Sequence, residues 1–363
     1  MASYDLNKFD HKTIVTKPYD LTYSYYVSPE FKVARDEGSL PTLVFAHGYP
    51  DDAFMWEMAL PHFTQKYPII VLDLLGFGGS SKPTEWNRYN YKQQADSIAQ
   101  ILDSEGVKDN VIPIGHDWGS GTMQRFYLYH RERCVGLVLL SLAYQLPDPE
   151  PFNLDDANVK TAKRFGYPQW EYWNFFTAPD APKVMREDLK RFFEVNNGFL
   201  ASPDPAENGR DIWMREMFCV KNGMDDYMRR QGKYKDFTVQ LKSYPNGERT
   251  LQRFIDRLSR DGLEGPVCYY HALKHNTMIE DERLLCKSED RREQKIDVPL
   301  LYIGQTGDWV CRTDLMSDAQ KIGLVPDLEE RVIDAGHWVL YEKPEEVANT
   351  IQDWLSRRFP AKA

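Results

Sequence analysis

Short apolar runs that alternate with helix-like segments constrain the fold of this chain more than any other feature. Five such runs occur, at residues 43–46, 69–72, 111–114, 135–140 and 299–303, and residues 328–333, which include charged side chains, are expected to form a sixth strand. They lack polar alternation, which is typical of strands buried on both faces of a parallel sheet. Segments with helical spacing or a helix-start signal lie between or after them, at residues 91–105, 119–133 and 344–358. The repeated strand–helix order predicts an α/β fold.

This order is interrupted once, between residues 144 and 295. Aromatic, charged and proline residues mix there, and apolar runs are absent. We therefore expect a mainly helical insertion. A chain of 363 residues, 42% of them hydrophobic, can build one large core. The predicted organisation is a core domain made of residues 1–143 and 296–363, with a helical cap, or lid, at residues 144–295.

The third apolar run leads into residues 115–119, Gly-His-Asp-Trp-Gly, and then directly into a predicted helix. This is the small-x-nucleophile-x-small pattern of a tight strand-to-helix turn, and the glycines let the central side chain stand clear. The central residue is Asp117, where serine is usual. Aspartate is also a favoured helix N-cap. The motif alone leaves both interpretations open.

Two further residues follow later strands in a telling order. Asp308 ends the loop after the run at 299–303, and His337 follows the strand expected at 328–333. Ligands of open α/β sheets bind beyond the carboxyl ends of the strands, and α/β-hydrolases keep the order nucleophile, acid, histidine. An exposed loop aspartate and a structural histidine are the alternatives. Because all three residues follow this order, we predict a triad of Asp117, Asp308 and His337.

The loop after the first run contributes a further element. It reads His47, Gly48, Tyr49 and Pro50. The backbone amides of Tyr49 and Trp118 are predicted to form an oxyanion hole, with His47, Gly48 and Pro50 supporting the loop. The Tyr49–Pro50 bond is a candidate for the cis isomer.

These motifs, together with Gly-Phe-Gly-Gly-Ser at 76–80, resemble those of the soluble epoxide hydrolases of the α/β-hydrolase superfamily. The resemblance covers nearly the whole chain, most firmly residues 40–143 and 296–358. It implies a mostly parallel sheet flanked by helices and an inserted helical cap. It also implies two cap tyrosines that hold the epoxide oxygen. By the surrounding residues 172–176 and 262–270 these are Tyr172 and Tyr270, with Tyr269 as the neighbour that could be confused with Tyr270.

The nucleophile type indicates the chemistry. A serine that attacked an alkyl carbon would leave an ether, whereas aspartate leaves an ester that activated water can cleave. The resulting hypothesis is attack by Asp117 on an epoxide carbon, with tyrosine hydroxyls bound to the ring oxygen. His337, oriented by Asp308, then activates water, and a vicinal diol leaves. The expected substrate is a small apolar or aromatic epoxide, bound near Trp118, Trp173 and Phe176.

Other functions fit less well. A haloalkane dehalogenase shares the aspartate and Trp118, but it usually has a polar side chain at the position of Tyr49 and has no need of cap tyrosines. A fluoroacetate-type dehalogenase has arginine at the position of Trp118. A catalytically silent binding protein on this scaffold typically lacks a triad member. His271 and His275 have the i, i+4 spacing of metal ligands but lack the glutamate of the zinc motif. No cofactor or metal is expected.

Composition bounds the partners and the compartment. The net charge is −10 with no basic stripe, which argues against binding to nucleic acid. No window approaches 18 uninterrupted apolar residues, and the first ten residues lack the apolar stretch of a secretory signal. The five scattered cysteines indicate reduced thiols in a cytoplasmic protein. The final Ala-Lys-Ala (361–363) lacks the leucine of a peroxisomal signal. The oligomeric state is not encoded in any motif.

Overall fold

The computed structural model describes residues 4–36 and 40–361. Within them, eight strands form one sheet in the order β1-β2-β4-β3-β5-β6-β9-β10. The last two residues of the C-terminal tripeptide lie outside the described residues. The strands are β1 (Asp10–Thr16), β2 (Leu21–Val27), β3 (Thr42–Ala46), β4 (Ile69–Asp73), β5 (Val111–His116), β6 (Leu137–Leu140), β9 (Leu300–Gln305) and β10 (Leu328–Ile333).

The six predicted strands are confirmed, and all of them run parallel to one another. Every residue of β3, β4, β5, β6 and β9 is buried, as their unbroken apolar character requires. The strand β10 lies at the sheet edge and exposes three of its residues. The antiparallel hairpin β1–β2, which extends the other edge, is not anticipated in the sequence.

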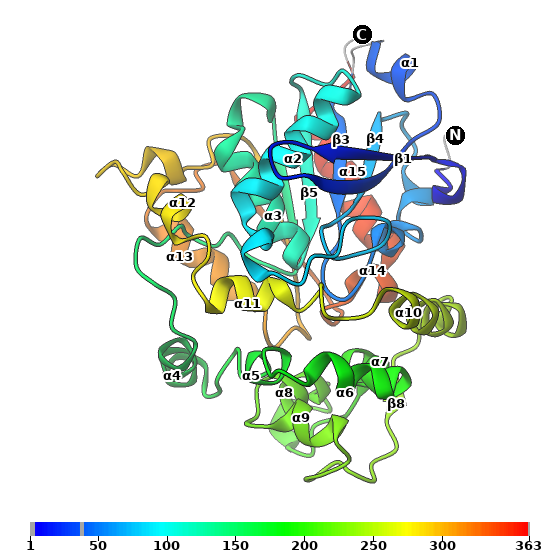
Figure 1. Cartoon of the computed structure of the whole chain (residues 1–363), viewed down its shortest axis with the longest axis vertical. Helices are drawn as coiled ribbons and strands as arrows, with labels where there is room; N and C mark the ends of the chain where they lie inside the picture. Colours follow the sequence, from blue (N-terminus) through cyan, green and yellow to red (C-terminus); the bar gives the residue numbers. More distant parts are fainter. Residues whose placement is uncertain (1–3, 37–39, 362–363) are drawn as a thin grey trace.

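Helices cover both faces of the sheet, with α2 and α3 in front and α15 behind in Figure 1. The helices of the core are α1 (Phe31–Asp36), α2 (Tyr91–Ser104), α3 (Trp118–Tyr129), α13 (Met316–Lys321), α14 (Val339–Glu342) and α15 (Pro344–Arg358). The helix predicted at 119–133 is shorter than expected. Its backbone leaves the helical region at His130 (φ −134°, ψ 41°), and residues 131–133 form a separate 3₁₀ turn.

The segment between β6 and β9 is mainly helical. Its helices are α4 (Leu154–Phe165), α5 (Trp173–Phe176), α6 (Ala181–Glu187), α7 (Leu189–Asn197), α8 (Trp213–Phe218), α9 (Gly223–Met228), α10 (Gly247–Asp261), α11 (Cys268–Lys274) and α12 (Ile279–Leu284). Helices α4 to α9 form the lower part of the molecule in Figure 1, away from the sheet. One unpredicted strand pair, β7 (Gly198–Phe199) with β8 (Gln240–Leu241), also lies in this segment.

Two expectations from composition concern the whole fold. All five cysteines are free thiols; four are buried and Cys286 is half-buried. In the ranges 4–36 and 40–361, no helix combines the length and the apolar character that crossing a bilayer requires.

Candidate active site

The turn between β5 and α3 holds Asp117 in a rare backbone conformation. Its φ is +53° and its ψ is −123°, a strained region for a residue with a side chain. The turn is tight because its flanking residues have no side chains. A Cβ on Gly115 would lie 2.4 Å from backbone atoms of Gly119, and a Cβ on Gly119 would lie 2.4 Å from the carbonyl oxygen of His47. The carboxylate of Asp117 makes no capping hydrogen bond to α3, so the N-cap interpretation is wrong.

The Asp117 carboxylate faces the first loop and the last one. Its Oδ1 accepts a hydrogen bond of 2.9 Å from the backbone amide of Tyr49. Its Oδ2 lies 3.5 Å from Nε2 of His337. Burial acts to raise the pKa of Asp117, but the hydrogen bond and charge of His337 outweigh it, so the pKa lies below its ordinary value. The group is therefore an anion, as the predicted nucleophile requires.

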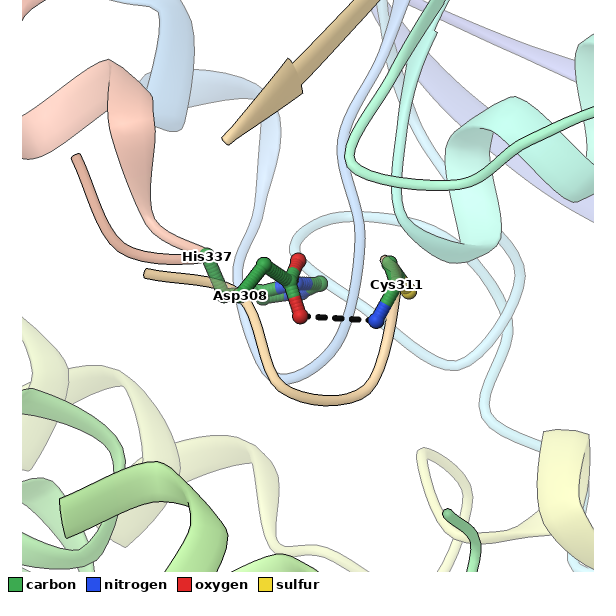
Figure 2. A group of neighbouring side chains, drawn as sticks. All are labelled: Asp308, Cys311 and His337. Carbon is green, nitrogen blue, oxygen red and sulfur yellow. Dashed lines mark hydrogen bonds and ion pairs between the residues drawn. The ribbon is translucent and has the colours of Figure 1, made fainter. Parts of the chain in front are cut away.

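His337 and Asp308 form a short, buried pair (Figure 2). Nδ1 of His337 lies 2.6 Å from Oδ2 of Asp308. The other oxygen, Oδ1, accepts from the amides of Val310 and Cys311, at 3.0 and 2.7 Å. Burial alone would lower the pKa of His337, but the charge of Asp308 and hydrogen bonds to both aspartates hold it well above its ordinary value. The structure thus brings together the three residues predicted as a triad.

Cys311, beside this pair, was not singled out from the sequence. Its sulfur, a carboxylate oxygen of Asp308 and a ring nitrogen of His337 are possible metal ligands and lie within 4.8 Å of one another. Figure 2 shows the three side chains. Such a set could hold a metal ion, yet both Asp308 oxygens and Nδ1 of His337 are already engaged in hydrogen bonds. Burial raises the pKa of the Cys311 thiol to about 12, so it stays protonated. His271 and His275 instead stack on each other, with ring centroids 5.7 Å apart.

The loop of residues 47–50 closely approaches the elbow, which is the strand-to-helix turn of residues 115–119. The Tyr49–Pro50 peptide is cis, as anticipated. A Cβ on Gly48 would lie 2.4 Å from Cβ of Asp117, so only glycine fits there. His47 accepts the amide of Leu74 at Nε2 (3.0 Å) and lies 2.9 Å from the Gly48 carbonyl at Nδ1. Burial lowers the pKa of His47 to about 4, so the ring is neutral and supports this loop through its hydrogen bonds.

Tyr172, at the start of α5, and Tyr270, in α11, come together near Asp117. Their ring centroids are 5.8 Å apart. Burial raises the pKa of both well above the ordinary value, and the negative charge of Asp117 acts in the same direction. Both hydroxyls therefore keep their protons at neutral pH. Tyr269 points elsewhere, since its hydroxyl donates to Oε1 of Gln94 at 2.8 Å.

Aromatic rings surround Tyr270. The ring centroids of Tyr49, Trp118, Trp173 and Phe176 lie 5.2, 5.0, 5.4 and 4.8 Å from that of Tyr270. The three residues predicted to line the pocket therefore meet around this tyrosine. The indole of Trp118 acts to lower the pKa of Tyr270, against the larger effect of burial.

Fold and site together are those of an α/β-hydrolase fold with a carboxylate, Asp117, at the centre of the turn between β5 and α3. A family profile described as alpha/beta hydrolase fold matches residues 41–200. The chain therefore has the alpha/beta hydrolase fold.

Its relatives include named epoxide hydrolases. It is 26% identical to bifunctional epoxide hydrolase 2 of Mus musculus over 93% of this chain and 56% of that protein, so it spans about half the length of that relative. It is 24% identical to epoxide hydrolase B of Mycobacterium tuberculosis, with 88% and 92% of the two chains covered.

Solved structures share the fold. Epoxide hydrolase A from Mycobacterium thermoresistibile superposes with a TM-score of 0.73 at 21% identity, over 98% of this chain and 100% of the other. An epoxide hydrolase from Vigna radiata superposes with a TM-score of 0.70 at 19% identity, over 97% and 99%.

Proposed function

We propose that this protein is an epoxide hydrolase that converts apolar or aromatic epoxides to vicinal diols through an ester on Asp117. One observation carries the proposal: two protonated tyrosines, Tyr172 and Tyr270, lie close to a carboxylate nucleophile. The leaving group of an epoxide is an alkoxide that needs hydrogen-bond donors. The similarity to named epoxide hydrolases supports the same function.

In the first step, a carboxylate oxygen of Asp117 attacks one ring carbon. The carbon–oxygen bond of the ring breaks, and its electron pair goes to the ring oxygen, which takes a proton from Tyr172 or Tyr270. An alkyl ester of Asp117 forms. This step uses up the negative charge of Asp117, one of the two carboxylates that hold the pKa of His337 high. His337 thereby becomes a better base once the ester exists.

In the second step, Nε2 of His337 takes a proton from water, and the hydroxide oxygen attacks the carboxyl carbon of Asp117. The amides of Tyr49 and Trp118 stabilise the oxyanion that develops there. The Tyr49 amide already donates to Oδ1 of Asp117 at 2.9 Å, which is the distance this role needs. The ester bond breaks, the diol oxygen takes a proton from His337, and the diol leaves. The second proton of the water, left on the Asp117 carboxyl group, returns to the tyrosinate formed in the first step, which restores the starting state. Asp308 keeps the ring oriented throughout.

A haloalkane dehalogenase is less well supported. Its halide site would need a polar side chain at the position of Tyr49. That residue is only 4% exposed and packs on Phe77, Phe176 and Tyr270. Its hydroxyl contacts the sulfur of Met185 at 3.6 Å.

The free thiols support activity in the cytoplasm, a reducing compartment.

The test is a single turnover of styrene oxide in oxygen-18 water with enzyme in excess, followed by mass spectrometry of the diol and of the peptide that contains Asp117. Diol formation with label in Asp117 is expected, because water attacks the carboxyl carbon. Asp117→Ala serves as the control and should form no diol. Diol without label in Asp117 would mean direct attack of water on the epoxide and would refute the ester.

A further inference from the structure

A buried network of charged side chains lies directly after the loop of residues 47–50. The residues that follow Pro50 are Asp51 and Asp52, which are 2% and 8% exposed. Burying two adjacent carboxylates is costly unless cations and donors compensate them. Burial raises the pKa of Asp51 to about 6 even though the guanidinium of Arg257 acts in the opposite direction. The compensation comes from two segments that are distant in sequence.

The first segment is helix α10, which lies between β6 and β9 in the chain. Its Arg257 has a side chain that is 6% exposed. The guanidinium Nη1 donates to the carbonyl oxygen of Pro50. Nη2 lies 3.6 Å from Oδ1 of Asp51, and Nε lies 3.6 Å from Oδ2 of Asp52. One side chain of the insertion thus holds three consecutive residues of the core loop.

The second segment is the loop that carries His337. Oδ2 of Asp51 accepts from the indole nitrogen of Trp338 at 3.2 Å. Oδ1 of the same carboxylate accepts from the hydroxyl of Tyr341. Trp338 directly follows His337. Asp51 therefore joins the loop of the proposed base to the loop of the proposed oxyanion hole, and Arg257 ties both to α10.

We propose that Arg257 is a positioning residue, which sets the Tyr49 amide and His337 against Asp117 by holding Pro50 and Asp51. This inference rests on the proposed function. Both groups act in the hydrolysis of the ester, so a loosened network slows kcat. Contacts with the bound epoxide and the first step do not involve Arg257, so the ester accumulates, KM falls together with kcat, and kcat/KM changes little. A displacement of about 1 Å at a reacting group can cost roughly 100-fold in rate.

The same helix offers a matched control. Arg253 lies one turn before Arg257, and its Nη2 is 3.8 Å from Oδ2 of the same Asp52. Its side chain is 33% exposed and stacks on Phe54 rather than reaching Pro50. A general loss of positive charge near Asp52 would affect both arginines alike. A positioning role affects only Arg257.

The experiment compares Arg257→Met, Arg257→Lys and Arg253→Met in steady-state hydrolysis of styrene oxide. We expect kcat of Arg257→Met to fall about 100-fold with a parallel fall in KM and little change in kcat/KM, and the lysine variant to recover part of kcat. Arg253→Met should stay near wild type. Unchanged kcat in Arg257→Met, or equal losses in both methionine variants, would overturn the assignment.

Hydrogen–deuterium exchange separates this inference from the proposed function, because it needs no substrate. Arg257→Met should raise exchange in peptides that cover residues 46–52 and 334–341, and Arg253→Met should raise neither. If the wild type forms no diol, the proposed function fails while exchange still tests Arg257. If Arg257→Met does not fold, Asp51→Asn takes its place and should raise exchange at 334–341. Wild-type exchange in the variant measured would refute the network.

Discussion

Replacement of Asp308 by asparagine should stop the cycle at the ester. The carboxylate serves three donors: Nδ1 of His337 at one oxygen, and the amides of Val310 and Cys311 at the other. An asparagine oxygen placed opposite the two amides leaves its NH₂ group facing Nδ1. The ring must then accept at Nδ1 and carry its hydrogen on Nε2. Nε2, which lies 3.5 Å from Oδ2 of Asp117, can no longer take a proton from water.

The two half-reactions respond differently, and this sets the magnitude. Attack by Asp117 needs no base, so the ester still forms. Its hydrolysis should slow by about 10,000-fold, the size of effect that follows when a histidine base is held in the wrong tautomer. Loss of the charge-assisted hydrogen bond should lower the free energy of unfolding by about 1.5–3 kcal/mol.

The assay is intact-protein mass spectrometry after Asp308→Asn is mixed with excess styrene oxide and quenched with acid. We expect one substrate mass to be added per protein, with a stoichiometric burst and slow turnover after it. Asp334→Asn is the control, because Asp334 is an exposed carboxylate on a neighbouring loop that bonds to Thr306. Turnover within about tenfold of wild type, well short of that tautomer effect, would refute this account of Asp308.

Three further predictions concern other parts of the site. Tyr270→Phe should slow ester formation by about 100-fold in stopped-flow kinetics. Tyr269→Phe should keep its activity, but its free energy of unfolding in urea should fall by about 1 kcal/mol because Gln94 loses its donor. Equal kinetic losses in the two variants would contradict the assignment. Gly119→Ala should lower the free energy of unfolding by about 1–3 kcal/mol, since its Cβ would lie 2.4 Å from the His47 carbonyl oxygen, and a wild-type urea midpoint would contradict the close approach. The pKa of His337 is higher in the folded than in the unfolded chain. Its contribution to stability is therefore complete below about pH 6.5 and is lost as the pH rises through the folded pKa. The free energies of urea unfolding of wild type and His337→Gln, measured across pH 6–10, should converge at high pH, and a constant difference would refute the shift.

The parallel core could be predicted from the sequence because burial on both faces leaves unbroken apolar runs. Strands β3, β4 and β5 begin within one residue of the predicted positions. The hairpin β1–β2 could not be predicted in this way. The edge strand β1 mixes exposed, half-buried and buried positions, so its sequence carries no apolar run. The pair β7–β8 is only two residues long on each side, which is too short for any periodic pattern.

The elbow could be predicted for a similar local reason. Gly115 is required by a contact with Gly119 inside the turn itself, so this requirement appears in the motif. The role of Arg257 depends on Pro50, which is 207 residues away in the chain. Local sequence contains no signal for such a contact, and one arginine cannot be chosen among 45 basic residues. Tyr270 likewise differs from Tyr269 only through the side of α11 on which each side chain lies.

The pairing of β6 with β9 has a consequence for how the chain acquires its activity. Leu137 pairs with Leu300, so β9 can join β6 only after the whole segment between them has been synthesised. Contacts of such long sequence separation form late and slowly. During synthesis Asp117 emerges first, and Asp308 and His337 follow only after the helical insertion has been made. A nascent chain that ends before residue 300 therefore carries the proposed nucleophile without the two residues proposed to complete the reaction.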